Sequence, residues 1–295
     1  MPKKLRKRLL ITPLLALALN GCGGGNGVNG GPGTLNLAIT DAPVDDALQI
    51  WVEFTGVEIQ PSSGTPINID FTPQKKINLL NLQGSNFEWL LDGQSISAGT
   101  YSWIRLKVNA AQGTNASELV NSSGVHSLYI PSGSETGLKL NSAFTILGGT
   151  TLGLTIDFDL RKSVHLPQGI VADYVLKPSL RLVHTSLAGH IAGTVPANQA
   201  SAANCAGAVY LFAGHNITPD DAQPALVSTA QVKLNGGSGQ YEYEIGFITR
   251  GNYTVAFTCE ADNDDPASND AVAFFDDANV IIEPGKTIMY NFSTP

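Results

Sequence analysis

Residues 152–161 read LGLTIDFDLR, and this stretch decides the fold class. Apolar side chains stand at every second position, namely Leu152, Leu154, Ile156, Phe158 and Leu160. Successive side chains of a β-strand point to opposite faces of the sheet. The pattern therefore predicts a strand with one face in a core and the other face in water.

Similar short runs, separated by Gly, Pro, Asn and Asp, follow one another from residue 34 onward and predict an all-β chain. In the run 48–59 the alternation changes at Gly56, which predicts a β-bulge or a bend at that glycine. The further candidates are strands over 104–108 and 174–182, the latter with Pro178 at a sheet edge or bulge, and one short helix over 86–91.

The first 21 residues have the pattern of an export signal. Five basic residues at positions 3–8 precede an apolar run over 9–19, which is about half the length that a membrane-spanning helix needs. The following Leu19-Asn20-Gly21-Cys22 resembles the bacterial lipobox. This resemblance implies that Cys22 is diacylated and becomes the first residue of the mature protein. Gly23 after it implies an outer-membrane location, facing the periplasm or the cell surface.

Residues 22–33 comprise this cysteine and the Gly-rich segment GGGNGVNGGPG, which predicts a flexible tether. The whole chain carries 17 basic and 25 acidic residues, and without residues 1–21 the balance is 12 minus 25, or −13. No basic surface remains to neutralise phosphates, so nucleic acid is excluded as a partner. The expected partners are a lipid bilayer, through acylated Cys22, and an unknown protein or glycan.

The charge composition changes near residues 186–189. Nine basic residues stand against 13 acidic ones over 34–188, whereas three stand against 12 over 189–295. This step predicts two domains, over 34–187 and 188–295.

Four motifs of the first domain resemble the bacterial lipoprotein domain of unknown function 4382. They are GTLNLAITDAP over 33–43, AGTYSWIRL over 98–106, IDFDLRKSV over 156–164 and YVLKPSLRL over 174–182. The resemblance implies a β-sandwich on an exported lipoprotein, and it implies no catalytic residues.

The second domain is similar to the carboxypeptidase regulatory-like, or transthyretin-like, β-sandwich. The likeness rests on GQY at 239–241, GNYTV at 251–255 and EPGKT at 283–287. It implies a module that packs, spaces or binds without being a peptidase. The alternating runs 241–247 and 253–259 flank a short turn and predict a β-hairpin.

Cys205 and Cys259 both lie in the second domain of a chain expected to be exported, and neither stands in a CxxC motif. We therefore expect a disulfide between them in preference to two buried thiols.

Four carboxylates, Asp262, Asp264, Asp265 and Asp270, are concentrated in the loop after Cys259. Carboxylate oxygens suit Ca²⁺, but the EF-hand pattern fails because its glycine and final glutamate positions hold alanine. The sequence favours a solvated acidic loop that is mobile through its own repulsion, with a weak Ca²⁺ site as the alternative.

Catalytic patterns are sparse. Asp157 and Asp159 share one strand face, where acid–base chemistry would need them, but solvation or pairing with Arg105 or Lys107 is favoured. The five histidines show no metal-ligand or catalytic spacing. Three tryptophans offer either a carbohydrate platform or a second packed layer, namely Trp51, Trp89 and Trp103.

The sequence thus predicts two tandem antiparallel β-sandwich domains behind a lipoprotein signal peptide and a tether. We expect a membrane-anchored envelope lipoprotein that is not an enzyme and acts as a binding or structural module. The alternative is a calcium-dependent, adhesin-like or carbohydrate-binding surface protein. No cofactor other than that calcium is expected.

Overall fold

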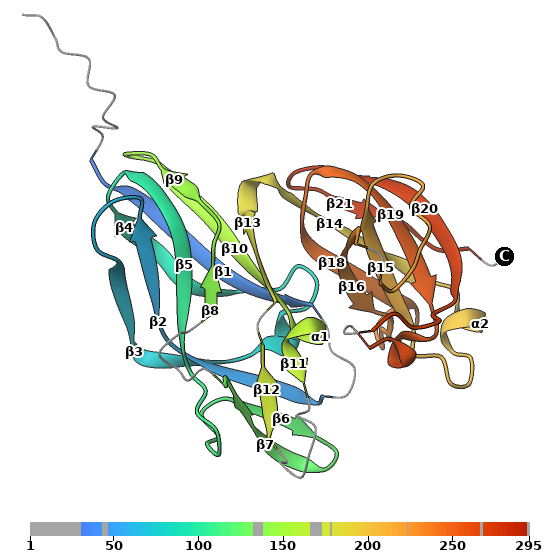
Figure 1. Cartoon of the computed structure of the whole chain (residues 1–295). Coiled ribbons are helices and arrows are strands. Elements are labelled where there is room, and N and C mark those ends of the chain that lie inside the picture. Colours follow the sequence, from blue (N-terminus) through green and yellow to red (C-terminus); the bar gives the residue numbers. More distant parts are fainter. Residues whose placement is uncertain are drawn as a thin grey trace, which may run out of the picture.

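The computed structural model describes residues 31–42, 47–131, 138–165, 173–177, 179–222, 224–265 and 268–293. Nearly all of its regular structure is β-strand, arranged as two β-sandwich units that lie side by side (Figure 1). The first unit ends with a short 3-10 helix, η2 (Thr185–Leu187), and the second begins with strand β14 at Ala188. The all-β prediction is confirmed.

Two sheets form the first unit. One has four strands in the order β13 (Leu180–His184), β10 (Thr151–Asp159), β1 (Gly33–Ala42) and β4 (Glu88–Ile96). The main path of the other runs β11 (Val164–His165), β12 (Tyr174–Leu176), β7 (Gly124–Tyr129), β6 (Glu118–Asn121), β2 (Gln49–Pro61), β5 (Gly99–Asn109) and β8 (Leu138–Leu140). β3 (Ile67–Asn78) pairs with β2, and β9 (Phe144–Ile146) pairs with β5. Two short helices complete the unit, η1 (Leu79–Leu82) and α1 (Leu160–Ser163).

Alternating apolar residues of the two sheets meet in one core. Leu37 on β1, Phe54 on β2 and Phe158 on β10 have no exposed surface. The predicted irregularity at Gly56 is present, because the pairing of β2 with both β3 and β5 shifts between Phe54 and Gly56. A Cβ at Gly56 would lie 2.5 Å from the backbone oxygen of Ile69, so the bulge requires glycine.

The second face of β10 is not in water, contrary to prediction. Thr155 and Asp157 are buried on that face, where the Thr155 hydroxyl lies 2.9 Å from that of Thr185. The neighbouring strands β13 and β1 contact strands of the second unit, which cover this side of the sheet. Strand alternation reveals one core face but does not reveal that a second unit covers the other.

Two local predictions were wrong. The expected strand over 174–182 is divided between β12 in one sheet and β13 in the other, while Pro178 lies outside the described residues. The expected helix over 86–91 falls largely within strand β4, whose Leu90 and Leu91 are both buried. A run of six residues is too short for its apolar spacing to distinguish a helix from a buried strand.

The second unit also has two sheets. One has the order β17 (Lys233–Leu234), β18 (Tyr241–Thr249), β14 (Ala188–Val195) and β21 (Thr287–Met289). The other has the order β16 (Leu226–Gln231), β15 (Ala208–Ala213), β19 (Gly251–Thr258) and β20 (Phe274–Ile282). The short helices are α2 (Ala197–Ala200) and η3 (Ala261–Asn263). Most described strand pairs are antiparallel, but β1 with β10, β7 with β12 and β14 with β21 are parallel.

The predicted hairpin is wrong, because β18 and β19 belong to different sheets. The chain crosses from one sheet to the other at Arg250, and the Tyr253 hydroxyl donates to the Thr249 carbonyl at 2.7 Å across this crossing. Tyr243 and Ile245 of β18 face Val255 and Phe257 of β19 across the second core. The same alternation of apolar and polar residues occurs in the two strands of a hairpin and in two strands of facing sheets. The sequence pattern could therefore not distinguish the two arrangements.

Candidate functional site

The predicted anchor, Cys22, lies outside the described residues, as do the signal peptide and nearly all of the tether. None of the helices in the described part of the chain has the length and apolar character needed to cross a membrane.

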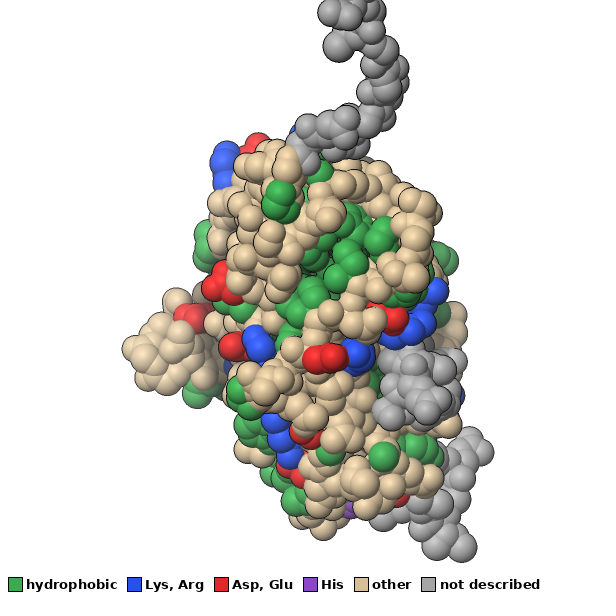
Figure 2. Space-filling model, turned by 90° about the vertical axis from the view of Figure 1, so that its left-hand side faces the viewer, with side chains coloured by type: hydrophobic (Ala, Val, Ile, Leu, Met, Phe, Trp, Pro, Cys, Tyr) green, Lys and Arg blue, Asp and Glu red, His purple; other side chains and the backbone are tan. Residues whose placement is uncertain are grey.

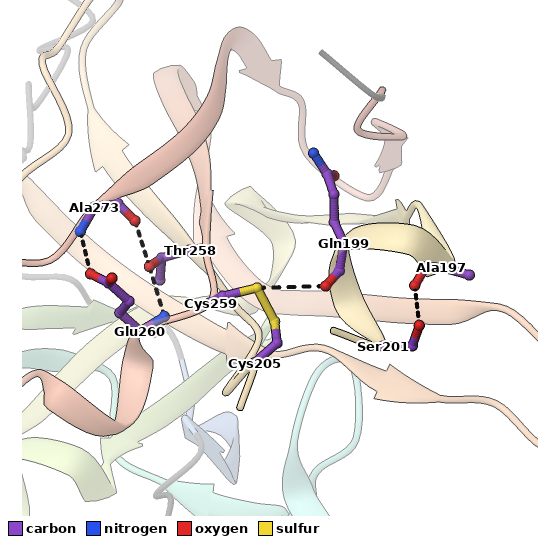
Figure 3. The surroundings of a disulfide bond; sticks show 8 residues. All are labelled: Ala197, Gln199, Ser201, Cys205, Thr258, Cys259, Glu260 and Ala273. Atoms are coloured by element: carbon purple, nitrogen blue, oxygen red, sulfur yellow. Dashed lines mark hydrogen bonds between the residues drawn. A yellow bond between two sulfur atoms is a disulfide. The ribbon is translucent and has the colours of Figure 1, made fainter. Parts of the chain in front are cut away.

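Cys205 and Cys259 form the predicted disulfide (Figure 3). Their Cα atoms are 4.4 Å apart and their sulfurs 2.00 Å apart. Cys205 follows the turn after α2 and Cys259 follows the last residue of β19, so the bond fastens the α2 segment to the second core. Beside it, the Ala206 N–H donates to the Cys259 carbonyl at 2.9 Å.

The acidic loop begins directly after this disulfide, and hydrogen bonds hold its base (Figure 3). The Thr258 hydroxyl donates to the Ala273 carbonyl at 2.7 Å and accepts from the Glu260 N–H at 3.0 Å. The Glu260 carboxylate accepts from the Ala273 N–H at 2.8 Å. These contacts fix both ends of the loop between β19 and β20.

Asp264 of this loop points into the protein. Its side chain is 3% exposed, forms a 2.5 Å ion pair with Arg161, and accepts a hydrogen bond from the Tyr210 hydroxyl. Arg161 belongs to α1 of the first unit, is 8% exposed, and donates to the Tyr210 oxygen at 3.1 Å. Burial raises the pKa of Tyr210 far above its ordinary value, so its hydroxyl remains a donor. The charge of Asp264 is therefore balanced by a cation of the other unit.

The predicted calcium ligands are only partly brought together. Asp264, Asp270 and, in addition, Asp221 can place ligand atoms within 4.8 Å of one another, whereas Asp262 and Asp265 are exposed and outside this group. Asp221 accepts from the Asp270 N–H at 2.8 Å. A hard cation could bind these oxygens only in competition with the guanidinium of Arg161, which lowers the affinity expected of the group.

The predicted acid–base pair has a different role. Asp157 is 7% exposed and forms an ion pair with Arg181 of the neighbouring strand β13. The Nε of Arg181 also donates a hydrogen bond to the Asp157 carboxylate at 3.1 Å. Asp159 instead lines a small cavity together with Arg161 and Asp221. The predicted partners of these aspartates bind elsewhere, because Arg105 pairs with Glu58 at 2.6 Å and Lys107 with Asp70 at 2.6 Å.

The three tryptophans do not form one platform. Cationic groups of Arg105 and Lys139 lie 4.9 and 4.5 Å from the centre of the Trp103 ring and cover it. Trp51 donates to the Gln49 side chain at 2.9 Å, and Trp89 packs edge-on against Phe87 with ring centres 4.8 Å apart.

Two further contacts join the units. Phe87 of the first unit and His190 of the second both pack edge-on against Phe247, with ring centres 6.0 and 5.1 Å from it. At the second contact the backbones touch, since a Cβ at Gly246 would lie 1.8 Å from the Gly84 oxygen. Phe247 has a φ of 51°, which is rare for a bulky residue, and it lies where the pairing of β14 with β18 shifts register between Gly189 and Ile191.

A groove of about 500 Å³ opens beside this backbone contact. Its polar lining includes Gln83 of the first unit and Lys233, Glu242, Glu244 and Asn291 of the second. The Lys233 ammonium of the second unit donates a hydrogen bond to the Gln83 side chain of the first unit at 2.6 Å. The charged and amide groups of this lining can bind polar groups of a ligand, and Ala192, Ala230 and Met289 add apolar surface beside them.

Sequence reasoning missed Arg161, Tyr210 and Asp221 as neighbours of the acidic loop. Arg161 and Asp264 are 103 residues apart and lie in different units, so no spacing within a motif could have revealed their contact. The one available signal was charge, because a loop with four carboxylates needs a countercharge to be buried.

Residues 32–178 match the model of the family described as Domain of unknown function (DUF4382). The resemblance of the first unit to this family is thereby confirmed, while that of the second unit to the carboxypeptidase regulatory-like module stays a prediction. A search of curated proteins found no match.

Three examples follow of solved structures that are similar to this chain. The TIE protein of Bacillus anthracis is 10% identical with a TM-score of 0.20, and the match covers 89% of this chain but only 34% of that one, so this chain spans about a third of it. GBS52, the minor pilin of Streptococcus agalactiae, is 9% identical over 88% of this chain and 97% of its own, with a TM-score of 0.20. The shaft pilin SpaA of Lactobacillus rhamnosus GG is 8% identical, and the match covers 89% of this chain and 99% of the pilin, with a TM-score of 0.21.

Proposed function

We propose that this chain is an envelope lipoprotein, held at the outer membrane by acylated Cys22, whose two domains, 34–187 and 188–295, act together as a non-enzymatic structural or binding module. The observation that carries the proposal is the buried contact of Arg161 with Tyr210 and Asp264, which fastens the two units to each other. A protein that presents a surface at a distance from its anchor needs such a fixed junction. The ion pair of Asp157 with Arg181 supports a structural role for Asp157, which together with Asp159 had suggested acid–base catalysis.

The anchor is tested by Cys22→Ser, expressed as the full chain with its signal peptide. We expect the wild-type protein to sediment with membranes and the variant to appear in the soluble periplasmic fraction. The double variant Cys205→Ser with Cys259→Ser is the control, because it removes the other two cysteines, which are bonded to each other, leaves Cys22 in place and should stay with membranes. A Cys22→Ser protein that still sediments after salt and carbonate washing would refute the lipoprotein assignment.

The second candidate function is a calcium-dependent adhesin-like or carbohydrate-binding protein. The cluster of Asp221, Asp264 and Asp270 and the polar groove at the junction favour it. If it is right, Ca²⁺ binds with Kd of about 10⁻⁴ to 10⁻³ M, as in extracellular modules.

A melting experiment on the full mature chain tests this candidate. Millimolar Ca²⁺ should raise the melting temperature by several degrees, and Asp221→Asn with Asp270→Asn should abolish the increase. Asp262→Asn is the matched control, since it removes an exposed carboxylate outside the cluster and should leave the increase intact. Absence of any shift in the wild-type protein would reject calcium, and a glycan array would then test the groove by itself.

A further inference from the structure

The register of the strands places several loops at the end of the molecule where β1 begins. Gly33 lies against Leu147, and Thr34 pairs with Thr151 of the parallel strand β10. Gly153, two residues further along β10, is close to Thr185 of η2. The loops 147–150 and 185–187 therefore lie at the same end as Gly33, at the top of Figure 1.

Hydrogen bonds extend this end into the second unit. The Arg250 N–H donates to the Leu187 carbonyl at 3.2 Å, and the Gly285 N–H donates to the Ala188 carbonyl at 2.7 Å. On the other side, the Ser62 N–H donates to the Thr100 carbonyl at 2.9 Å, beside the strand pair of Gly99 with Ile146. We call these loops the anchor-proximal end; they comprise residues 62–66, 147–150, 185–187, 250–252 and 283–286.

The charge of the anchor-proximal end differs from that of the rest of the protein. The loops 62–66, 147–150 and 185–187 contain no charged residue, although the chain from Cys22 onward has a balance of 12 minus 25, or −13. Two of the three basic residues over 189–295, Arg250 and Lys286, are found here. Figure 2 shows the first unit from one side; most charged side chains lie at mid-height and below, and basic and acidic side chains are also visible at the upper left edge.

Exposed apolar side chains lie at the same end. Leu147 is 53% exposed, Leu187 is 49% exposed and Ile281, next to the loop at Glu283, is 55% exposed. Arg250, Ile281 and Lys286 border an open hollow of about 410 Å³. Glu283 is the one carboxylate at its rim and forms a 2.5 Å ion pair with Lys286, so Arg250, Lys286 and Glu283 together give the rim a balance of two minus one, or +1.

The length of chain before β1 limits the distance between this end and the anchor. Gly33 is 11 residues after Cys22, and such a segment spans at most about 40 Å even when fully extended. A bilayer that holds Cys22 is therefore always within reach of the anchor-proximal end. A surface held so near its ligand encounters it at high effective concentration, so a weak affinity is sufficient for docking.

We propose that the anchor-proximal end docks on the headgroup layer of an anionic bilayer, with Arg250 and Lys286 facing lipid phosphates and the exposed leucines and Ile281 entering the interface. The proposal rests on the proposed acylation of Cys22. An anionic surface repels the acidic remainder of the protein within a Debye length, about 8 Å at physiological salt, and attracts the anchor-proximal end, whose described loops have a balance of +1. The second unit is thereby held at the membrane, and the far end of the first unit faces away from it.

Fluorescence quenching on vesicles tests this orientation. The full lipidated protein carries one introduced cysteine, Leu147→Cys or, as a control of matched exposure, Val125→Cys on β7, which is 54% exposed and lies at the bottom of Figure 1. The introduced thiol is the one free for labelling, because Cys205 and Cys259 are bonded and Cys22 is acylated. The vesicles contain phosphatidylcholine and phosphatidylglycerol with a nitroxide-headgroup lipid as quencher.

We expect quenching at position 147 to be several-fold stronger than at position 125, and Arg250→Glu with Lys286→Glu to remove most of that difference. Equal quenching at both positions on protein that floats with the vesicles would overturn the docking while leaving the anchor intact. Protein that fails to float would overturn the anchor and the docking with it. A strong difference that persists in the Arg250→Glu, Lys286→Glu variant would overturn the assigned role of these two cations.

Discussion

At the scale of single residues, Arg161 is the side chain on which the junction depends most. It lies 8% exposed between the two units and balances the buried charge of Asp264. A buried carboxylate that loses its cation remains in a medium that solvates it poorly, and the cost of breaking such a pair is about 3–5 kcal/mol. The geometry therefore makes one arginine of the first unit essential for the acidic loop of the second.

We predict that Arg161→Ala lowers the free energy of unfolding by about 3–5 kcal/mol. Lys107→Ala is the control, because the pair of Lys107 with Asp70 is exposed and should contribute about 0–1 kcal/mol. Denaturant titration of both variants measures the difference. Equal effects of the two substitutions would show that the Arg161 contact is no stronger than a surface ion pair.

We predict that His190 makes the stability of the fold depend on pH. Burial lowers the pKa of His190, and the nearby Glu244 carboxylate opposes this shift in part. Its Nδ1 is buried without a hydrogen-bond partner among the described residues, and its ring packs on Phe247. The unfolded chain, with a histidine pKa of about 6.5, therefore binds the proton more readily than the folded protein.

It follows that the free energy of unfolding falls as the pH is lowered through about 6.5 toward the folded pKa, and that above this range the histidine costs nothing. His190→Gln should make the loss of stability between pH 7.5 and pH 5 smaller. Parallel denaturation curves at these pH values check the prediction. An unchanged pH profile in the variant would assign the dependence to other groups.

At the scale of secondary-structure elements, the sequence predicted the all-β class and several strands, but it mistook part of β4 for a helix and did not predict which strands are partners. Alternation placed Ile104, Leu106 and Val108 in the core, and all three are buried. It failed for β18 and β19, because inward-facing residues alternate in the same way in a hairpin and in two opposed sheets. Pairing depends on contacts far apart in the chain, which local patterns do not encode.

In the candidate site, too, local features were predictable from the sequence and contacts between distant segments were not. The disulfide was predictable because only two cysteines remained in the second domain once Cys22 was assigned to lipid. The link from Arg161 to Asp264 was not, because it depends on how the two units pack. The burial of Asp157 follows from that packing as well, since neighbouring strands of its sheet contact the second unit.

The disulfide allows a quantitative prediction at this scale. It joins residues separated by 54 positions, and closing a loop of that length stabilises a fold by about 4 kcal/mol in the chain-entropy description. The double variant Cys205→Ala with Cys259→Ala should unfold its second unit at correspondingly lower denaturant. Exchange of amides on β19 would report this unit. If the variant lowered the denaturant midpoint of the first unit alone, the disulfide would not be what stabilises the second unit.

At the scale of the whole molecule, the described contacts between the two units include the Arg161 cluster, the rings around Phe247, the Lys233–Gln83 hydrogen bond, and the backbones of Gly84 and Gly246. The last has no room for a side chain, because a Cβ at Gly246 would lie 1.8 Å from the Gly84 oxygen. A flexible side chain can change its rotamer to make room for an added methyl group, whereas two backbones in contact can make room only if one segment moves. A substitution here should act on the relative position of the units.

We predict that Gly246→Ala moves the units apart and increases the radius of gyration in small-angle X-ray scattering. Gly236→Ala is the matched control, since a Cβ at that glycine meets nothing within 4 Å. The disulfide and both cores should be retained, so circular dichroism should stay unchanged. Scattering curves that superimpose for the wild-type protein and Gly246→Ala would show that this contact does not set the arrangement.

The central claim, that this two-unit protein is held at a membrane by its first mature residue, is tested most directly by the intact mass and N-terminal peptide of the protein purified from its own envelope. We predict a mature chain that begins at Cys22 and carries a diacylglyceryl group on Sγ. A mature chain that begins at another residue, or one in which Cys22 has a free thiol, would contradict the account.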